Sequence, residues 1–540
     1  MSAAIPNRSG SITAESGITA GTQRGFAYRK YLFLLFLISL PLINPIVHGD
    51  GVGYYAYARA PLIRHNLRFE EDWQRANIYF SSSRVQDDQQ LKVDQYTSTG
   101  YVGNHFTVGP AMLWAPFLIV AHLIVLLCNA LGAHIGVDGF SSPYLVAMAL
   151  GTAIYGFLGL LLSFSLARKY VQERWAFLAT VGIWLATSLP VYMYFNPAWS
   201  HAHSAFAVAL FLWYWDRTRV PAISDDSARA TPRCQTRSLR QWIVLGFIAG
   251  LMIDVYFPNG VFLLLPMIEA LLAHWKLWWA QPPQLSQTEQ VAPPAQLVKT
   301  EQLSRASQSW RGQLNLIGSE VAFVLAILIA AVPTFITRRI IYGSVLRFGE
   351  YTTYPWRWSA PHWREVLFSS DHGLLSWAPI LALAIAGLFL APRRVRVVSS
   401  YLMAGGLAFY YVIACYPFWD GLASFGNRFF ISVTPVFIFG LAILFERMAE
   451  LFRDKTRAFV TAAGFVVALA AWNAGFIIQW GEHLVPVRGP ISFRTMVHNQ
   501  FFVVPQELTG HLRGYLFRRK DEMKKIEQLD IDQMNRKPTS

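Results

Sequence analysis

The chain has 540 residues, of which 54% are hydrophobic and only 14% are charged, and its mean hydropathy is +0.32. Because soluble domains carry about 25% charged residues, this composition excludes a soluble globular protein. The net charge of +14 would suit a nucleic-acid binder. However, the basic residues lie in short clusters between apolar runs, as in cytoplasmic loops of membrane proteins, so nucleic acid is excluded as a partner.

The N-terminal region, residues 1–30, is predicted to be cytoplasmic and disordered, because its first 23 residues are rich in Ser, Thr, Ala and Gly. Basic residues then precede the apolar run 31–47. No small-residue cleavage site precedes the next polar segment, so this run is predicted to be an uncleaved first span. The three cysteines show neither metal-ligand nor redox spacing.

Apolar runs of membrane-spanning character recur along the chain, each approaching the roughly 20 residues that a span requires. They are residues 31–47, 143–167, 175–195, 204–216, 241–257, 261–279, 316–337, 373–391, 399–416, 431–446 and 457–477. The basic clusters between them all fall on one side, which is assigned to the cytoplasm. We therefore predict an all-α, polytopic transmembrane bundle of about 11–12 spans over residues 31–480.

Three segments do not fit a simple alternation of spans. The apolar run 110–131 would invert the later orientation if it crossed, so it is predicted to be re-entrant or in-plane on the outer face; the alternative is a misplaced neighbouring run. Residues 280–315 are Pro- and Gln-rich at the start and predicted to be a cytoplasmic linker. Residues 481–540 form an amphipathic tail, which the span count places outside and its charge places inside.

Unusual polar residues collect in the segments predicted to lie outside. The long first outer loop, residues 48–109, is predicted to contain interfacial helices. Ionisable groups beside apolar runs are costly and mark functional sites, so their convergence on one face predicts a single site at the outer membrane boundary. The candidates are Asp50, His105, His201, His203, Arg338, Arg339, Asp420, Asn427 and Arg428.

Each candidate has a structural alternative. Asp50 stands in a Gly-Asp-Gly sequence before a helical pattern, so it either caps that helix or serves as a general base. Arg428 either extends its side chain toward water or binds an anion, and the same alternatives hold for Arg338 and Arg339. His201 and His203 are either polar groups at a helix start or ligands for phosphate or a metal.

The layout resembles the GT-C superfamily of membrane glycosyltransferases, which includes dolichyl-phosphate-mannose protein mannosyltransferases and lipid A aminoarabinose transferases. The resemblance covers about residues 25–480. Three short segments carry it: the early Asp50 with GVGYYAYARAPLI, the outer-face GNHFTVGPAMLWAPF, and SFGNRFFISVTPVF with Arg428 before a late span. Many members have a second acidic residue where this chain has Gly-Val-Gly-Tyr, so a divalent metal is left open.

The resemblance implies transfer of a sugar from a polyprenyl-phosphate donor to an acceptor hydroxyl on a glycolipid, glycan or protein, with inversion. It would occur on the outer face of a bilayer, in a bacterial inner membrane. Asp50 would be the base, and Arg428, with Arg338 or Arg339, would hold the donor phosphate. His105, His201, His203, Asp420 and Asn427 would contact substrate or metal. The competing hypotheses are a lipid or glycolipid transporter or flippase and a structural membrane subunit.

Overall fold

The structure is a computed structural model. It describes residues 18–79, 84–86, 88–219, 237–279, 295–347, 354–486 and 488–519, together with 521–523, 525–526 and 528–529. Within these residues, seven helical stretches are long and apolar enough to cross a membrane, by length and composition. The fold is an all-α bundle, and the predicted polytopic fold class is confirmed.

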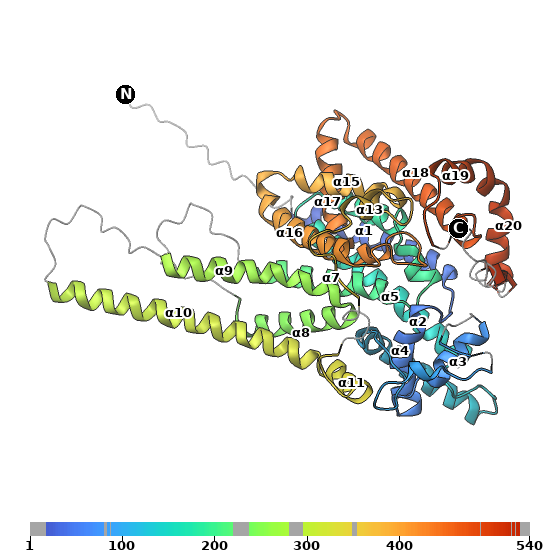
Figure 1. The fold of residues 1–540 in the computed structure, drawn as a ribbon. Helices are drawn as coiled ribbons and strands as arrows, with labels where there is room; N and C mark the ends of the chain where they lie inside the picture. Colours follow the sequence, from blue (N-terminus) through green and yellow to red (C-terminus); the bar gives the residue numbers. More distant parts are fainter. Residues whose placement is uncertain are drawn as a thin grey trace.

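The first half of the chain supplies the outer-loop helices and half of the bundle (Figure 1). Its elements are α1 (Ile18–Ser39), η1 (Leu40–Leu42), α2 (Asp50–Arg59), η2 (Ala60–Arg64), α3 (Glu70–Tyr79), η3 (Val93–Gln95), α4 (Gly109–Ala130), α5 (Ser142–Ala167), α6 (Glu173–Leu185), η4 (Val191–Phe195), α7 (His201–Thr218), α8 (Leu239–Val255), η5 (Phe257–Leu263) and α9 (Leu264–Trp279).

The second half completes the bundle and ends in short helices. Its elements are α10 (Ala295–Ala330), α11 (Val332–Tyr342), α13 (Trp363–Phe368), α14 (Leu374–Trp377), α15 (Ile380–Phe389), α16 (Arg393–Cys415), η6 (Arg428–Val433), α17 (Thr434–Glu450), α18 (Lys455–Gly481), α19 (Phe493–His498), η7 (Asn499–Val503) and α20 (Val504–Phe517). Every predicted span coincides with one or two of these helices. Helix α17, buried along its length, is the centre of the bundle.

Two predicted segment boundaries are wrong. Helix α1 begins at Ile18, inside the region predicted to be disordered, because the Tyr28 ring packs 5.1 Å from the Phe177 ring of α6 and extends the order beyond the apolar run. Residues 295–315 of the predicted linker belong to α10, since their Gln, Leu, Lys and Glu are good helix formers. Residues 1–17 and 280–294 lie outside the described residues.

Basic clusters from distant loops meet at one end of the bundle, which we call the basic end. Lys169, after α5, lies 2.8 Å from the Asp216 carboxylate of α7. Arg394, at the start of α16, lies 3.0 Å from the carboxylate of Glu446 in α17. These ion pairs involve the basic clusters that are predicted from the sequence to lie on one side of the bundle. The opposite end, which carries α2, is called the site end.

Helix α4 has the length and hydropathy of a crossing. It runs antiparallel to the first half of α5, because the Trp114 indole donates to the Thr152 hydroxyl and the His122 ring pairs with the Tyr144 hydroxyl, both at 2.8 Å. A Cβ on Gly109, its first residue, would come within 2.4 Å of the Asp254 carbonyl carbon at the end of α8. The loop after α4 is held by α2, because the Tyr55 hydroxyl donates to the Gly139 carbonyl at 2.6 Å. The in-plane or re-entrant segment at residues 110–131 stays a prediction.

Helix α2 is buried from Gly51 to Arg59, so it has no water-facing side of the kind expected for an interfacial helix. The reason is its small residues: a Cβ on Gly53 would overlap the Phe106 ring at 2.0 Å, so residues 103–106 lie directly against it. Arg59 then fixes α2 to α3, because its Nε and Nη2 donate to the two carboxylate oxygens of buried Asp72 at 2.7 and 2.6 Å.

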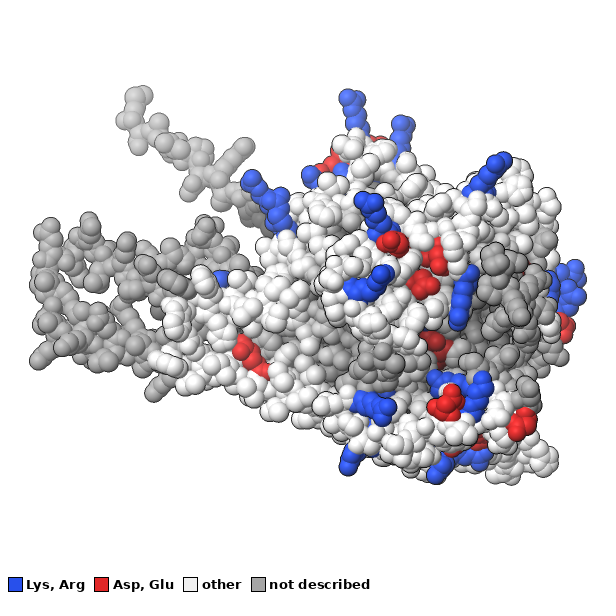
Figure 2. All heavy atoms as spheres, viewed as in Figure 1, with Lys and Arg blue, Asp and Glu red and all other residues white. Residues whose placement is uncertain are grey.

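Charged side chains are unevenly distributed over the surface of the molecule (Figure 2). Few charged side chains appear on the described part of the arm formed by α8, α9 and α10, whereas Lys, Arg, Asp and Glu are scattered over the rest of the face in view. Exposed apolar side chains such as Leu271 and Leu325 cover α9 and α10. The arm therefore has the surface of helices that contact lipid.

Candidate functional site

The site begins with the turn that leads from η1 into α2. Gly49 has φ +54°, a left-handed conformation, and a Cβ there would lie 2.9 Å from the Trp199 ring. The Trp199 indole donates to the His48 carbonyl at 3.1 Å, and the His48 ring pairs with the Asn196 side chain at 2.8 Å. The turn is therefore pressed onto the segment before α7, and only glycine fits at position 49.

Asp50, the first residue of α2, forms an ion pair with Arg428. The Asp50 Oδ2 and Arg428 Nη1 atoms are 2.6 Å apart, although 378 residues separate the two in the chain. The Asp50 side chain is 35% exposed, and that of Arg428 only 9%. Asp50 is also the acidic residue in the first turn of α2, where its charge suits the positive end of the helix, so the ion pair adds to the helix-end interpretation and does not replace it.

Arg428 is held at the start of η6, directly before the buried helix α17. Its guanidinium carbon lies 4.3 Å from the centroid of the Trp199 ring, a cation–π contact that stabilises a desolvated cation. Its Nε has no hydrogen-bond partner among the described residues. The preceding turn contains Gly421 and Gly426, both with positive φ. Trp199 thus supports both members of the Asp50–Arg428 pair.

Asn427 and Asp420 line the loop that approaches Arg428. The Asn427 amide donates to the Trp419 carbonyl at 3.0 Å, and its Oδ1 has no partner among the described residues. The Asp420 carbonyl accepts a hydrogen bond from the His372 Nδ1 at 2.9 Å. Burial and the nearby Asp420 carboxylate raise the pKa of Asp371, which precedes α14, so acidic groups from two different loops lie near each other here.

His372, the residue after Asp371, was not among the predicted site residues. Its φ of 61° is left-handed, which is uncommon for a residue other than glycine. Burial lowers the pKa of His372 to about 4, so its ring is neutral at pH 7. No sequence pattern marks a histidine whose main role is to hold the Asp420 backbone.

His105 lies in the segment packed against α2, since its ring is 4.1 Å from the ring of Phe106, which covers Gly53. Burial and the Arg84 guanidinium lower its pKa to about 4, although the Asp50 carboxylate opposes them. Its ring is neutral at pH 7 and can hydrogen-bond a polar group without carrying charge.

Arg338 does not face the Asp50–Arg428 pair as a free cation. It is 1% exposed. Its Nη1 donates to the Asn104 carbonyl at 2.9 Å, and its Nη2 to the His105 and Phe106 carbonyls at 2.7 and 2.9 Å. The predicted phosphate contact is therefore not supported, because both terminal nitrogens are used to hold the backbone.

Arg339, the neighbouring residue, is exposed and donates to the Gly343 carbonyl at the end of α11. This contact satisfies an otherwise unpaired helix-terminal carbonyl. The structure shows no approach of Arg339 to Asp50 or Arg428, so the sequence prediction that it holds phosphate is not supported either. The positive-inside rule marks both arginines as unusual, but it does not reveal backbone acceptors nearby.

His201 and His203 are both buried but face different neighbours, since residues two apart point to different sides of a helix. The His201 ring lies 5.0 Å from the Tyr192 ring and 6.3 Å from that of Phe429, next to Arg428. The His203 ring contacts Trp114 at 5.0 Å. The described residues contain no group of three His, Cys, Asp or Glu that could hold a metal ion. The two histidines therefore do not act together as a metal site.

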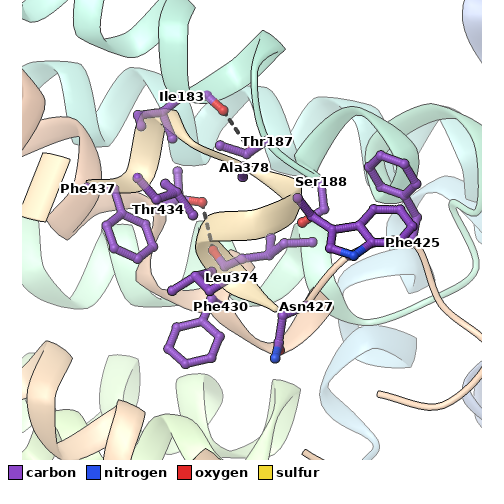
Figure 3. Close-up of a pocket in the computed structure, with 14 residues that line it drawn as sticks. Ile183, Thr187, Ser188, Leu374, Ala378, Phe425, Asn427, Phe430, Thr434 and Phe437 are labelled. Carbon is purple, nitrogen blue, oxygen red and sulfur yellow. Dashed lines mark hydrogen bonds between the residues drawn. The ribbon is translucent and has the colours of Figure 1, made fainter. Parts of the chain in front are cut away.

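A pocket lies beside Asn427 (Figure 3), between α6, α14, α15, η6 and α17. Its hydroxyl groups are largely turned back to their own helices, because Thr187 donates to the Ile183 carbonyl and Thr434 to the Ile431 carbonyl. The remaining walls are mostly apolar. They include Leu374, Trp377, Leu381, Phe425, Phe430 and Phe437. The chemistry of this pocket suits a hydrocarbon group better than a polar one.

Comparison with known proteins gives a distant structural likeness. No protein-family model matches the chain, and no curated protein matches its sequence. One similar solved chain is the archaeal oligosaccharyltransferase AglB from Archaeoglobus fulgidus, in complex with an inhibitory peptide and a dolichol-phosphate. It shows 15% identity and a TM-score of 0.44, with 86% of this chain and 58% of that chain covered.

A second similar solved chain is the Archaeoglobus fulgidus oligosaccharyltransferase in complex with Zn and sulfate. It shows 14% identity and a TM-score of 0.40, with the same shares of the two chains covered. The chain thus spans 58% of the length of the solved chains it matches. A likeness of this size assigns no family, so the chemistry of the site rests on its own residues.

Proposed function

We propose that the protein is a glycosyltransferase that moves a sugar from a polyprenyl-phosphate donor to an acceptor hydroxyl, with inversion at the anomeric carbon. The observation that carries the proposal is the Asp50–Arg428 pair. It places a partly exposed carboxylate 2.6 Å from a buried guanidinium, at the end of the bundle opposite the basic clusters. A base and an anion-binding cation are the two groups that this reaction requires.

In the proposed reaction, the acceptor oxygen attacks the anomeric carbon from the side opposite the phosphate. The bond between that carbon and the phosphate oxygen breaks, and its electron pair leaves with the polyprenyl phosphate. The Asp50 carboxylate takes the proton of the attacking hydroxyl. The phosphate already leaves as a stable anion, so no general acid is required, and the Arg428 guanidinium stabilises the charge that develops on it.

The geometry also couples donor binding to activation of the base. A donor phosphate would compete with the Asp50 carboxylate for the Arg428 guanidinium, because guanidinium binds phosphate and carboxylate in the same way. When the phosphate takes over this contact, the Asp50 carboxylate becomes available to the acceptor hydroxyl. The Trp199 ring, 4.3 Å from the guanidinium carbon, keeps Arg428 in place during the exchange.

Neighbouring residues fit the same assignment. His105 and Asn427 present a neutral ring and an unpartnered amide oxygen for sugar hydroxyls. The acceptor would approach from the open side of Asp50, which the first-loop segments leave 35% exposed. The proposed location is the outer face of a bacterial inner membrane.

The test uses the full chain in lipid nanodiscs with a synthetic, radiolabelled polyprenyl-phosphate sugar and a panel of acceptor hydroxyls on a glycolipid, a glycan and a peptide. Wild-type protein should release polyprenyl phosphate, and Asp50→Asn should lower the rate about 10²–10⁴-fold, the usual contribution of a positioned base. Asp94→Asn, an exposed carboxylate in the same loop, is the matched control and should leave the rate unchanged. Full activity of Asp50→Asn would refute the assignment of the base. Donor translocation across vesicles without bond cleavage would favour a flippase instead.

A further inference from the structure

The C-terminal segment, residues 493–519, packs at the site end of the bundle. It comprises α19, η7 and α20 and lies next to α18 (Figure 1). The Gln479 amide of α18 donates to the Met496 carbonyl at 3.1 Å and to the Gln500 side chain at 2.8 Å. The Gln500 amide donates back to the Trp472 carbonyl at 2.9 Å. These contacts place the tail against the C-terminal end of α18.

The inner face of this segment holds the connector between α1 and α2. The Tyr515 hydroxyl donates to the Leu42 carbonyl at 2.8 Å, and the Arg519 guanidinium donates to the Pro41 and Ile43 carbonyls. Three consecutive backbone carbonyls are thus bound by two side chains of the tail. The connector leads within a few residues to the turn that carries Asp50.

The outer face of the segment is apolar and basic. Its aromatic and aliphatic side chains are 38% to 81% exposed: Phe493, Val497, Phe501, Phe502, Leu508, Leu512, Leu516 and Phe517. The segment contains four arginines and one glutamate, and the side chains of Arg494, Arg513 and Arg518 are exposed. Basic side chains also project from the right-hand edge of the molecule in Figure 2, the edge near which α20 lies in Figure 1.

We propose that residues 493–519 lie in the headgroup region of the bilayer and bind an anionic lipid surface. An amphipathic helical segment with exposed Phe and Leu and flanking arginines has the properties of an interfacial anchor. The apolar face also continues the exposed surface of a spanning helix, because the Phe501 ring lies 5.9 Å from the Trp472 ring of α18. This continuity favours the protein's own bilayer over a soluble partner.

The contacts on the inner face give this anchoring a consequence for the site. The connector is bound from its other side as well, since the backbone N–H of Asn44 donates to the Tyr194 carbonyl at 2.7 Å. The tail and η4 therefore hold the connector between them. A tail fixed on the membrane surface keeps the turn at Asp50 at a constant depth relative to the lipid headgroups.

The experiment measures depth directly and does not depend on catalysis. In a full-length chain with the native cysteines replaced by alanine, Phe502→Cys is labelled with bimane and reconstituted in nanodiscs that contain doxyl-labelled lipid. The expected result is quenching at least about twofold stronger than at Gln506→Cys, an exposed polar position on α20, because an anchor buries its apolar face by roughly 5–10 Å. Leu512→Cys is a second reporter should the first fail to fold.

Two outcomes would overturn the proposal. Equal quenching at Phe502→Cys and Gln506→Cys would show that the apolar face does not enter the bilayer. Equal quenching in zwitterionic and anionic nanodiscs, or no loss with Arg513→Glu and Arg518→Glu together, would remove the role of anionic lipid. Because the readout is fluorescence, its result is separate from that of the sugar-transfer assay: either proposal can fail while the other holds.

Discussion

Exchanging the two charges of the Asp50–Arg428 pair separates a catalytic role from a structural one. The atoms are 2.6 Å apart, and the Arg428 side chain is 9% exposed. Leaving a buried polar group without its partner costs about 1–3 kcal/mol, and the 35% exposure of Asp50 places the loss of this ion pair near the lower end. Asp50→Asn should therefore cost about 1–2 kcal/mol, since it leaves a buried guanidinium without its counter-charge.

The double variant Asp50→Arg with Arg428→Asp should regain most of that loss. It restores opposite charges in the same place, and its new cost is an arginine at the positive end of α2, about 0.3–1 kcal/mol. Sugar transfer should stay at least about 10²-fold below wild type, because the base is no longer at position 50. Apparent melting temperature in detergent and release of labelled polyprenyl phosphate are the two measurements.

Recovery of transfer together with stability in the double variant would refute the reasoning, because it would mean that the pair acts only by holding α2 against α17. Loss of both sugar transfer and thermal stability in the double variant, with a normal melting temperature for Asp50→Asn, would also contradict the reasoning. In that case, the 2.6 Å contact contributes no stability that a charge exchange can restore.

Two further predictions concern the surroundings of the pair. Arg338→Met should lower the free energy of unfolding by about 3–5 kcal/mol because it leaves three buried carbonyls unpaired. Arg339→Met, its exposed neighbour, should leave the melting temperature unchanged, and equal effects would show that the carbonyl contacts are unimportant. The pKa of His372 is lower in the folded protein than in the unfolded chain. As the pH is lowered from 6.5 to 4, protonation of this group should therefore reduce the free energy of unfolding by up to about 3 kcal/mol. His372→Asn, which tolerates the left-handed backbone, should reduce that slope in thermal unfolding, while His105 keeps part of it; an unchanged slope would exclude His372 as a source.

The spans could be predicted from the sequence because the length and apolar composition of a crossing are local properties. Helix ends could not be predicted as well. Ile18 starts α1 in a Ser- and Gly-rich region because Tyr28 packs on Phe177, and that contact joins two helices. The same limit applies to α2: its burial depends on residues 103–106 lying over Gly53, which no local pattern reveals.

The candidate site could be predicted only as a group of residues on one face. Asp50 and Arg428 proved to be partners, but Arg338 and Arg339 looked equally suitable in the sequence. The three arginines differ in the groups that they contact. Arg338 and Arg339 donate to backbone carbonyls, whereas Arg428 forms an ion pair with a carboxylate. Carbonyl positions depend on the fold of a distant loop, so the residue types around an arginine do not identify its partner.

The contrast between the two buried arginines also argues for the role of Arg428. Both terminal nitrogens of Arg338 bind carbonyls that belong to the fold and cannot leave, so this cation is fully committed to structure. Arg428 instead rests on the Trp199 ring and meets one carboxylate that is itself partly exposed. A buried cation with an exchangeable partner can accept a phosphate without unfolding its surroundings, and a cation whose terminal nitrogens both bind backbone carbonyls cannot.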